Sequence, residues 1–274
     1  MAIDLFSIGR FTVHGYGLMI GLGFLAAVLG ASWQAKRKGL SADQLTNIAF
    51  WVLVIGFLGG KLLHIITNLR AFFADPKSLI GSEGFVVYGG IITGILSIYV
   101  YCKVKKLPFL EYIDIFATFV PLNQAFGRIG CFLAGCCYGR ETNSWIGVVF
   151  PDGCLAPAGV SVIPTQLIMA AGDLAICIIV FWFSKKRRIP GSCAVLYLFL
   201  YSVGRFIIEF FRNDPRGNVG VLSTSQFIAI IIAVIDGGCL YYLLKVKSGK
   251  AGDTVMSDEN TSDAENKAVD ESNI

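Results

Sequence analysis

GRIGCFLAGCCYGR, from Gly127 to Arg140, is the most unusual stretch of a very apolar chain, because it combines four glycines with two arginines. Glycine permits close backbone approach and positive φ angles, at a cost in helix stability. Arginine at membrane depth is expensive, so we expect it to face a partner or a water-filled cavity rather than lipid. The pattern predicts a broken or tightly packed helix end whose backbone N–H groups and guanidinium hold an anionic head group. A close-packed helix crossing with one snorkelling arginine would explain the same residues.

The composition of the chain is that of an integral membrane protein. Of its 274 residues, 55% are hydrophobic and 15% are charged, whereas soluble domains carry about a quarter charged residues. Apolar residues come in runs of about twenty, the length that spans a bilayer as a helix. We therefore predict an all-α membrane protein with seven transmembrane helices, over residues 12–35, 44–67, 85–102, 110–137, 163–184, 190–211 and 219–244.

Basic residues predict the orientation of these helices, because positive loops stay in the cytoplasm. They cluster after the first, third, fifth and seventh spans: Lys36-Arg37-Lys38; Lys103, Lys105 and Lys106; Lys185-Lys186-Arg187-Arg188; and Lys245, Lys247 and Lys250. The N-terminus is then expected outside and the C-terminus in the cytoplasm. Residues 1–247 form the predicted membrane domain, and the polar, acidic residues 248–274 form a disordered cytoplasmic tail. The chain has a net charge of +4, but the tail carries −5, so residues 1–247 carry +9. This excess is scattered through short loops, which fits anionic lipid surfaces better than nucleic acid.

The chain has eight cysteines, and none of them forms a C-x-x-C pair. This spacing argues against a zinc site and against a thioredoxin-like redox motif, so no metal and no cofactor is expected. Cys131, Cys136, Cys137 and Cys154 gather around the central stretch. A disulfide from Cys136 or Cys137 to Cys154 is one arrangement open to them on an oxidising face.

A second charged group lies in the sixth span, in the sequence YSVGRFIIEFFR from Tyr201 to Arg212. Tyr201, Arg205 and Glu209 are four residues apart and Arg212 follows three later, so all four are predicted on one helical face. Pairing Arg205 with Glu209 lowers the cost of placing either charge in the span. Two arginines around one carboxylate leave a positive face, which is what a phosphate group needs. A neutralised ion pair that only fixes helix packing is the alternative.

Several single polar residues occur near the predicted outer face. His14 begins the first span, where it could accept a proton or simply hydrogen-bond at the interface, and Tyr16 also suits an interfacial belt. Tyr88 opens the third span beside two glycines, which allow a neighbouring helix or ligand close to its hydroxyl. Asp173 and Asp236 are single acids in apolar runs, and no role is assigned to them.

Six motifs along the chain resemble, in order, those of the bacterial prolipoprotein diacylglyceryl transferases. The resemblance covers nearly the whole chain except the tail. The motifs are His14-Gly15-Tyr16-Gly17-Leu18-Met19, similar to H-x-Y-G-L-M; Phe57-Leu58-Gly59-Gly60-Lys61, similar to F-L-G-G-R; Tyr88-Gly89-Gly90, in the place of H-G-G; the stretch from Gly127 to Arg140; Pro164-Thr165-Gln166, similar to P-S-Q; and Gly204 to Arg212, similar to R-x-x-x-E-F-F-R.

The resemblance implies an enzyme of the bacterial plasma membrane. Such an enzyme moves the diacylglyceryl group of phosphatidylglycerol, a membrane lipid, onto the lipobox cysteine of a prolipoprotein signal peptide and releases glycerol phosphate. By resemblance, Arg128 holds the lipid head group and Arg205 stabilises the departing phosphate, while Glu209 orients Arg205 and Tyr16 lines the site. The full set of predicted site residues is Arg205, Glu209, Tyr88 and Tyr16 for catalysis, and Arg128, Gly127, Gly139, Arg212 and His14 for substrate binding.

Three departures from the family pattern surround the predicted site. Tyr88 stands in the place of a histidine, and neutral tyrosine is a poor base; losing a general base costs about 10²–10⁴ in rate. The family's N-F-x-N-x-E is replaced by the residues from Cys131 to Cys136, and the histidine before Pro164 is Ile163. The arginines remain, so electrostatics would replace the histidine. The alternatives are a family member with another thiol or alcohol acceptor, a phospholipid-binding protein without turnover, a transporter and a membrane thiol oxidoreductase.

Overall fold

A computed structural model describes residues 4–8, 11–81, 84–186, 189–212, 218–219 and 222–247. The predicted tail, residues 248–274, lies outside these described residues. The protein is mostly helical, as the composition predicts. Within the described ranges, six helices are long and apolar enough to cross a membrane. They are α1 (Gly15–Arg37), α2 (Ala42–Thr67), α5 (Val87–Lys105), α7 (Thr165–Lys186), α8 (Ser192–Glu209) and α9 (Thr224–Tyr241), which continues as a π-helical turn (Tyr242–Lys247).

A further long helix, α6 (Phe109–Leu133), lies among these six. The sequence predicts an interrupted fourth span over residues 110–137, and this prediction is wrong in two respects. The helix runs without a break through Pro121, which is fully buried, because neighbouring protein can compensate for a lost helical hydrogen bond. It also ends at Leu133, so the glycine-arginine stretch is partly helix and partly the turn that follows.

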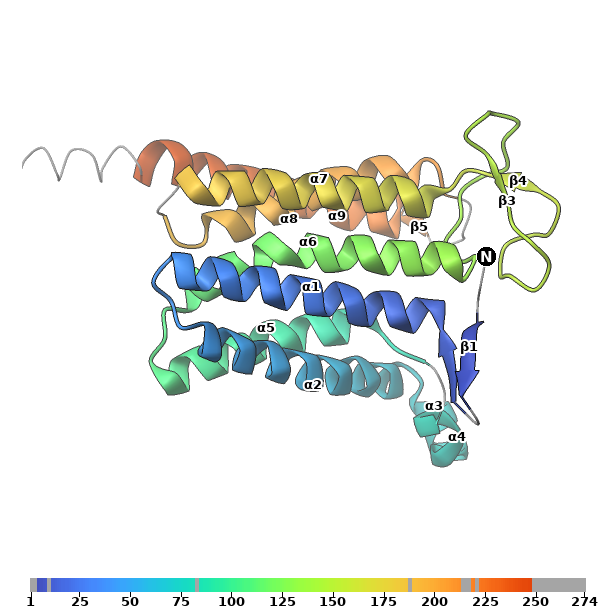
Figure 1. The fold of residues 1–274 in the computed structure, drawn as a ribbon, viewed down its shortest axis with the longest axis horizontal. Coiled ribbons are helices and arrows are strands. Elements are labelled where there is room, and N and C mark those ends of the chain that lie inside the picture. The colour runs from blue at the N-terminus through green and yellow to red at the C-terminus, as the bar shows by residue number, and fades with distance from the viewer. Residues whose placement is uncertain are drawn as a thin grey trace, which may run out of the picture.

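The long helices run side by side as a bundle (Figure 1), with α6 in contact with α1, α7 and α8. On one flank α2 packs against α5, and on the other α8 packs against α9. The α2–α5 contact depends on glycine, because a Cβ atom at Gly89 would lie 2.4 Å from the carbonyl oxygen of Gly59. Such close backbone approach is typical of packed membrane helices.

The main buried core lies at the end of the bundle where α1, α5 and α7 terminate, and the start of α8 is anchored at the same end. The core cluster there includes Leu45, Ile48 and Ile115. Asp114 on α6 is buried, and its carboxylate accepts hydrogen bonds from the backbone N–H groups of Gly191 (2.8 Å) and Ala194 (2.9 Å). This carboxylate therefore satisfies donors at the start of α8, which no helical carbonyl can reach.

Short strands and helices gather at the opposite end of the bundle (Figure 1). The prediction of an all-α fold is thus wrong in detail, because three antiparallel hairpins occur in the described chain. Their strands are two to five residues long and lie before α1 or in the connections between helices, too short to leave a periodic pattern. They are β1 (Asp4–Ile8) with β2 (Phe11–His14), β3 (Val148–Val149) with β4 (Ser161–Val162), and β5 (Asn218–Val219) with β6 (Leu222–Ser223); the short helices are α3 (Leu69–Ala74) and α4 (Pro76–Gly81).

Candidate functional site

A cavity of about 460 Å³ lies between α7 and α8, near the end of the bundle that carries the hairpins. Its walls are mostly apolar, and they include one cation, Arg205, and one acid, Asp173. Several apolar lining residues are also exposed on the outer surface of the helices, among them Ile168, Ile207 and Phe211. The cavity therefore joins a charged interior to the apolar face of the bundle.

Arg205 is held in this cavity by a chain of hydrogen bonds that ends on α9. Its Nη2 atom lies 2.8 Å from Glu209 Oε2, and it donates to Ser225 Oγ at 3.2 Å. The Ser223 hydroxyl donates to Glu209 Oε1 at 2.8 Å. Ser223 is also the N-cap of α9, in a capping box with Gln226. The ion pair predicted from the helical spacing is present, and two serines from another helix fix its geometry.

Arg128 reaches the same region from α6. It is half-buried, and it lies close enough to Asp173 for the two charges to interact. One oxygen of the buried Asp173 carboxylate, Oδ2, has no hydrogen-bond partner within the described part of the chain. Arg128 also interacts electrostatically with Tyr16, whose ring packs over Gly130. Arg205 thus lines the cavity from α8, and Arg128 on α6 interacts with the acid that lines it from α7.

Two tyrosines on α8, Tyr197 and Tyr201, extend the polar region that includes Asp173 of α7. The Tyr201 ring lines the cavity and lies 5.9 Å from the ring of Tyr197. The Tyr197 hydroxyl donates to Gln124 Oε1 on α6 at 3.0 Å. Gln124 is a polar residue of α6, and it joins this helix to α8.

Arg212 follows the end of α8, and its side chain is buried. Its guanidinium lies 3.9 Å from the sulfur of Met169, a residue that lines the cavity, and it also lies beside Cys137. Its backbone pairs with that of Gly139. Arg212 therefore sits between the cavity and the turn after α6, with Arg205 on the cavity side.

The turn after α6 brings three thiols together. The sulfur atoms of Cys131, Cys136 and Cys137 all lie within 4.8 Å of one another. Hydrogen bonds with the other two thiols and the Arg212 guanidinium lower the pKa of the Cys137 thiol, although burial acts in the opposite direction. All eight cysteines are free, so the disulfide to Cys154 is not formed.

The first turn of α7 holds this turn in place. Gln166 Nε2 donates to the Cys136 carbonyl at 2.7 Å, and Thr165 Oγ1 donates to the Cys137 carbonyl at 2.8 Å. Both side chains are fully buried. The residues of the Pro164-Thr165-Gln166 motif therefore have a structural function, which is to fix the cysteine turn against α7.

The two glycines predicted for substrate binding differ in their surroundings. A side chain at Gly139 would meet the Phe211 carbonyl oxygen at 2.6 Å, so this glycine is required by packing. A side chain at Gly127 would meet no atom within 4 Å, so this glycine borders open space on α6. A ligand therefore has room beside Gly127, whereas the space beside Gly139 is filled by the protein.

His14 and Tyr88 lie at the ends of helices. His14 is exposed at the start of α1, two residues before Tyr16. Tyr88 is 59% exposed in the first turn of α5, and none of the interactions described for it joins it to Arg128 or Arg205. The structure thus joins Arg205 to Glu209 and Arg128 to Tyr16 and Asp173, and none of the interactions described brings Tyr88 on α5 to these residues.

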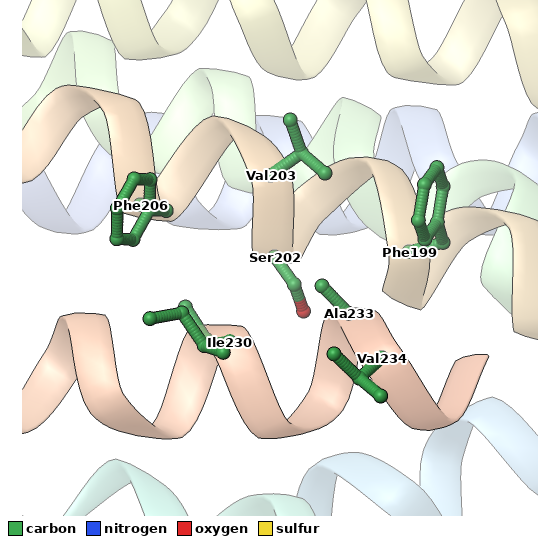
Figure 2. Close-up of a pocket in the computed structure, with 8 residues that line it drawn as sticks. Phe199, Ser202, Val203, Phe206, Ile230, Ala233 and Val234 are labelled. Carbon is green, nitrogen blue, oxygen red and sulfur yellow. The ribbon is translucent and has the colours of Figure 1, made fainter. Parts of the chain in front are cut away.

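A second pocket, of about 310 Å³, lies between α8 and α9. Figure 2 shows that its labelled side chains are apolar except for the hydroxyl of Ser202. Such a pocket suits hydrocarbon and offers nothing to a charged group. The cavity with Arg205 is therefore the candidate site.

Sequence reasoning missed Asp173, Ser223 and Ser225. Asp173 is a single acid in an apolar run, which itself marks a functional candidate in a membrane helix. The serines carry no such signal, because their contact with the sixth span depends on how α8 and α9 pack.

Comparison with known proteins finds relatives along nearly the whole chain. Residues 4–243 match the family model described as prolipoprotein diacylglyceryl transferase. Phosphatidylglycerol–prolipoprotein diacylglyceryl transferase 2 of Clostridium perfringens is 44% identical over 91% of this chain and 98% of that protein. The phosphatidylglycerol–prolipoprotein diacylglyceryl transferase of Clostridium tetani is also 44% identical, over 84% of this chain and 93% of its own length, and that of Clostridioides difficile is 32% identical over 88% and 96%. The chain therefore belongs to the prolipoprotein diacylglyceryl transferase family.

Proposed function

We propose that this protein transfers the diacylglyceryl group of phosphatidylglycerol to prolipoproteins. The observation that carries the proposal is the cavity between α7 and α8, in which Arg205 is fixed by Glu209 and which Arg128 approaches from α6. Family membership over nearly the whole chain supports the same reaction. The protein is accordingly a multi-pass protein of the bacterial plasma membrane.

Phosphatidylglycerol fits the two parts of the cavity. Fixed guanidinium groups suit its phosphate, because arginine binds phosphate through several parallel hydrogen bonds. The exposed apolar residues at the cavity wall, Ile168 and Ile207, give the acyl chains a path from the bilayer. We assign Arg128 to the head group and Arg205 to the phosphate that leaves, with Tyr16 at the edge of the site.

The reaction needs stabilised negative charge more than it needs a protein nucleophile. The acceptor thiol, which is the lipobox cysteine of the prolipoprotein, attacks the glyceryl carbon, and the bond from that carbon to the phosphate oxygen breaks. The electron pair stays on the departing glycerol phosphate, so charge grows where Arg205 is held. Preorganised donors at such a position are worth about 10²–10³ in rate each. Glu209 acts as a positioning residue through Arg205.

The remaining predicted residues have narrower roles in this scheme. Gly127 borders open space, which leaves room for the lipid against α6. Arg212 is buried beside Cys137 and adds positive charge behind the cavity wall. Gly139 lets the chain pass close to Phe211. His14, at the exposed start of α1, is placed to meet the lipid head groups.

We also propose that α6 is the seventh transmembrane helix and that the ends of α1, α5 and α7 face the cytoplasm. Basic residues at that end lie over an aromatic ring one turn earlier: Arg37 over Trp33 (4.6 Å), Lys103 over Tyr99 (5.8 Å), Lys185 over Phe181 (4.6 Å) and Lys245 over Tyr241 (5.5 Å). Such pairs are typical of the membrane interface, and basic residues favour its cytoplasmic side. The cavity would then open at the outer half of the bilayer, where secreted precursors emerge.

The proposal is tested with purified protein in detergent, labelled phosphatidylglycerol and a lipobox peptide. The expected result is a diacylglyceryl thioether on the peptide cysteine, and no product with a peptide in which serine replaces that cysteine. Saturable binding of phosphatidylglycerol without any product would contradict transfer and support a lipid-binding protein. The Arg205→Ala variant should lose at least about 100-fold in kcat.

A further inference from the structure

We propose that Cys131, Cys136 and Cys137 form a binding site for a thiophilic metal ion, with Zn²⁺ as the ion that their donor set fits and with a fourth position open to an external thiol. The sulfur atoms of these residues lie within 4.8 Å of one another. They come from the last turn of α6 and the tight turn that follows it. No role of these cysteines is needed for the anion site described above.

The spacing of the three sulfurs suits a zinc ion. With Zn–S bonds of about 2.3 Å, the sulfurs of a tetrahedral site lie about 3.8 Å apart. The widest pair in the cluster would therefore close by at most about 1 Å, which side-chain rotation can provide. A disulfide would instead require two sulfurs at about 2.05 Å and would leave the third alone.

The backbone of the turn is built to hold this arrangement. Cys137 has a φ of +62° and Gly135 a φ of +68°. A left-handed conformation in a non-glycine residue costs about 1–2 kcal/mol and persists where the surroundings impose it. Those surroundings are Gln166 and Thr165, whose side chains hold the Cys136 and Cys137 carbonyls. Side chains that fix the backbone of ligands in this way are a regular feature of metal sites.

The charge balance around the cluster favours a divalent cation. Three thiolates and one Zn²⁺ carry a net charge of −1, and the buried guanidinium of Arg212 lies beside Cys137. Arg128 interacts electrostatically with Cys131. A site with two cations nearby would not accept a metal through neutral ligands, but it can hold an anionic tris-thiolate complex.

The location of the cluster indicates what the fourth ligand is, and this step rests on the proposed function. Cys136 and Cys137 are partly exposed, Tyr16 borders the cluster, and Arg212 links Cys137 to Met169 of the cavity wall. A metal held by the three cysteines would lower the pKa of an acceptor thiol bound here, so that the thiol would give its proton to water and present a thiolate. That sulfur would then attack the glyceryl carbon as the carbon–oxygen bond to phosphate breaks, with the electron pair leaving on glycerol phosphate. The site would thus do the work of the histidine that Tyr88 replaces.

Metal content and Co²⁺ spectra of the full-length protein in detergent test the proposal. Wild-type protein loaded with Zn²⁺ and desalted should keep about one equivalent, and Co²⁺ should give intense sulfur-to-metal charge-transfer bands. Cys131→Ser, Cys136→Ser and Cys137→Ser should each weaken retention at least about tenfold, whereas Cys154→Ser and Cys239→Ser should retain the metal. Equal loss in all five variants, retention in Cys137→Ser, or a disulfide among the three cysteines in non-reduced peptide maps would overturn the metal site.

The fourth ligand is tested on the Co²⁺ protein with the lipobox peptide. The cysteine peptide should shift the charge-transfer bands, and its serine counterpart should leave them unchanged; no shift with either peptide would overturn the role of the acceptor thiol. Transfer activity separates this inference from the proposed function. Full activity in protein without metal would overturn the metal step and leave the transferase intact. Stoichiometric metal without any transfer would keep the site and contradict the proposed function.

Discussion

Replacing Glu209 by glutamine should lower kcat and leave the KM for phosphatidylglycerol no higher than in the wild type. Glutamine has nearly the same shape, and both polar contacts of Glu209, the ion pair with Arg205 and the hydrogen bond from Ser223, have a neutral counterpart in the variant. Its amide oxygen can face Arg205, 2.8 Å away in the wild type, while its NH₂ group faces the Ser223 hydroxyl. That hydroxyl already accepts one hydrogen bond, from the N–H of Gln226 at 3.1 Å, and it has a second lone pair. The substitution therefore removes charge with little change in shape.

The size of the fall in kcat follows from the loss of one charge in the contact between residue 209 and Arg205. Hydrogen bonds to charged groups contribute about 1.5–3 kcal/mol and neutral ones about 0.5–1.5 kcal/mol. A loss of about 1–2 kcal/mol in the orientation of Arg205 corresponds to a fall of about 5–30-fold in kcat. The KM should not rise, because removal of a negative charge beside the cavity favours an anionic lipid.

Steady-state transfer from labelled phosphatidylglycerol to a lipobox peptide measures both constants. Ser225→Ala is the matched control, since it removes one neutral hydrogen bond of Arg205, at 3.2 Å, and should cost about 2–10-fold in kcat. The reasoning is refuted if Glu209→Gln keeps the wild-type kcat while its KM rises. That result would mean that Glu209 helps to bind the lipid and does not position Arg205 for the departing phosphate.

Three further substitutions separate catalysis from folding. Tyr88→Phe should change kcat by less than about twofold, because no described interaction joins Tyr88 to the arginines; a fall of about 10² or more would show that its hydroxyl acts. Gly139→Ala should lower the free energy of unfolding by about 1–3 kcal/mol, because its Cβ would lie 2.6 Å from a backbone oxygen. Gly127→Ala should leave the melting temperature in detergent unchanged or higher. A loss of transfer activity in Gly127→Ala would therefore mean that the new methyl group interferes with lipid binding. Asp114→Ala leaves two backbone N–H groups of the α8 N-terminus without their acceptor and should cost about 2–4 kcal/mol in thermal unfolding; an unchanged melting temperature would contradict the capping role.

Local spacing predicted much of the candidate site. Arg205 and Glu209 are one turn apart on a helix, so their ion pair could be read from the sequence and is present in the structure. The central glycine-arginine stretch was correctly placed at a tightly packed helix end, with Gly130 against Tyr16. Local spacing could not predict that Arg128 lies near Asp173 or that Ser223 contacts Glu209. Those contacts depend on which helices become neighbours.

The cysteine cluster shows a different limit of the sequence. The absence of C-x-x-C pairs argued against a metal site, because that spacing places two thiols together in a simple turn. Here Cys131 is the third-last residue of α6, and Cys136 and Cys137 return to it through two left-handed residues. Where α6 ends could not be predicted to within a turn, since the expected span continued to residue 137. Four residues of error in a helix end were enough to hide the cluster.

The short strands could not be predicted from local sequence spacing either. The hairpins that include β3 with β4 and β5 with β6 consist of two-residue strands in connections rich in polar residues and turns. Their pairing is set by the helices that bring the connections together, as the bridge between Gly139 and Arg212 illustrates. The long apolar helices, in contrast, are determined by composition and length alone.

Lipid transfer by the Arg128→Ala variant, beside Arg140→Ala, tests most directly whether two guanidinium groups hold the phosphate of phosphatidylglycerol. Both arginines belong to the same stretch of chain, but Arg128 lies near Asp173, while Arg140 is exposed and makes its described side-chain contact with the Arg212 carbonyl. The account predicts that Arg128→Ala loses at least about 100-fold in kcat/KM and that Arg140→Ala stays within about threefold of the wild type. Equal activity of the two variants, with both folded in detergent, would contradict the central claim.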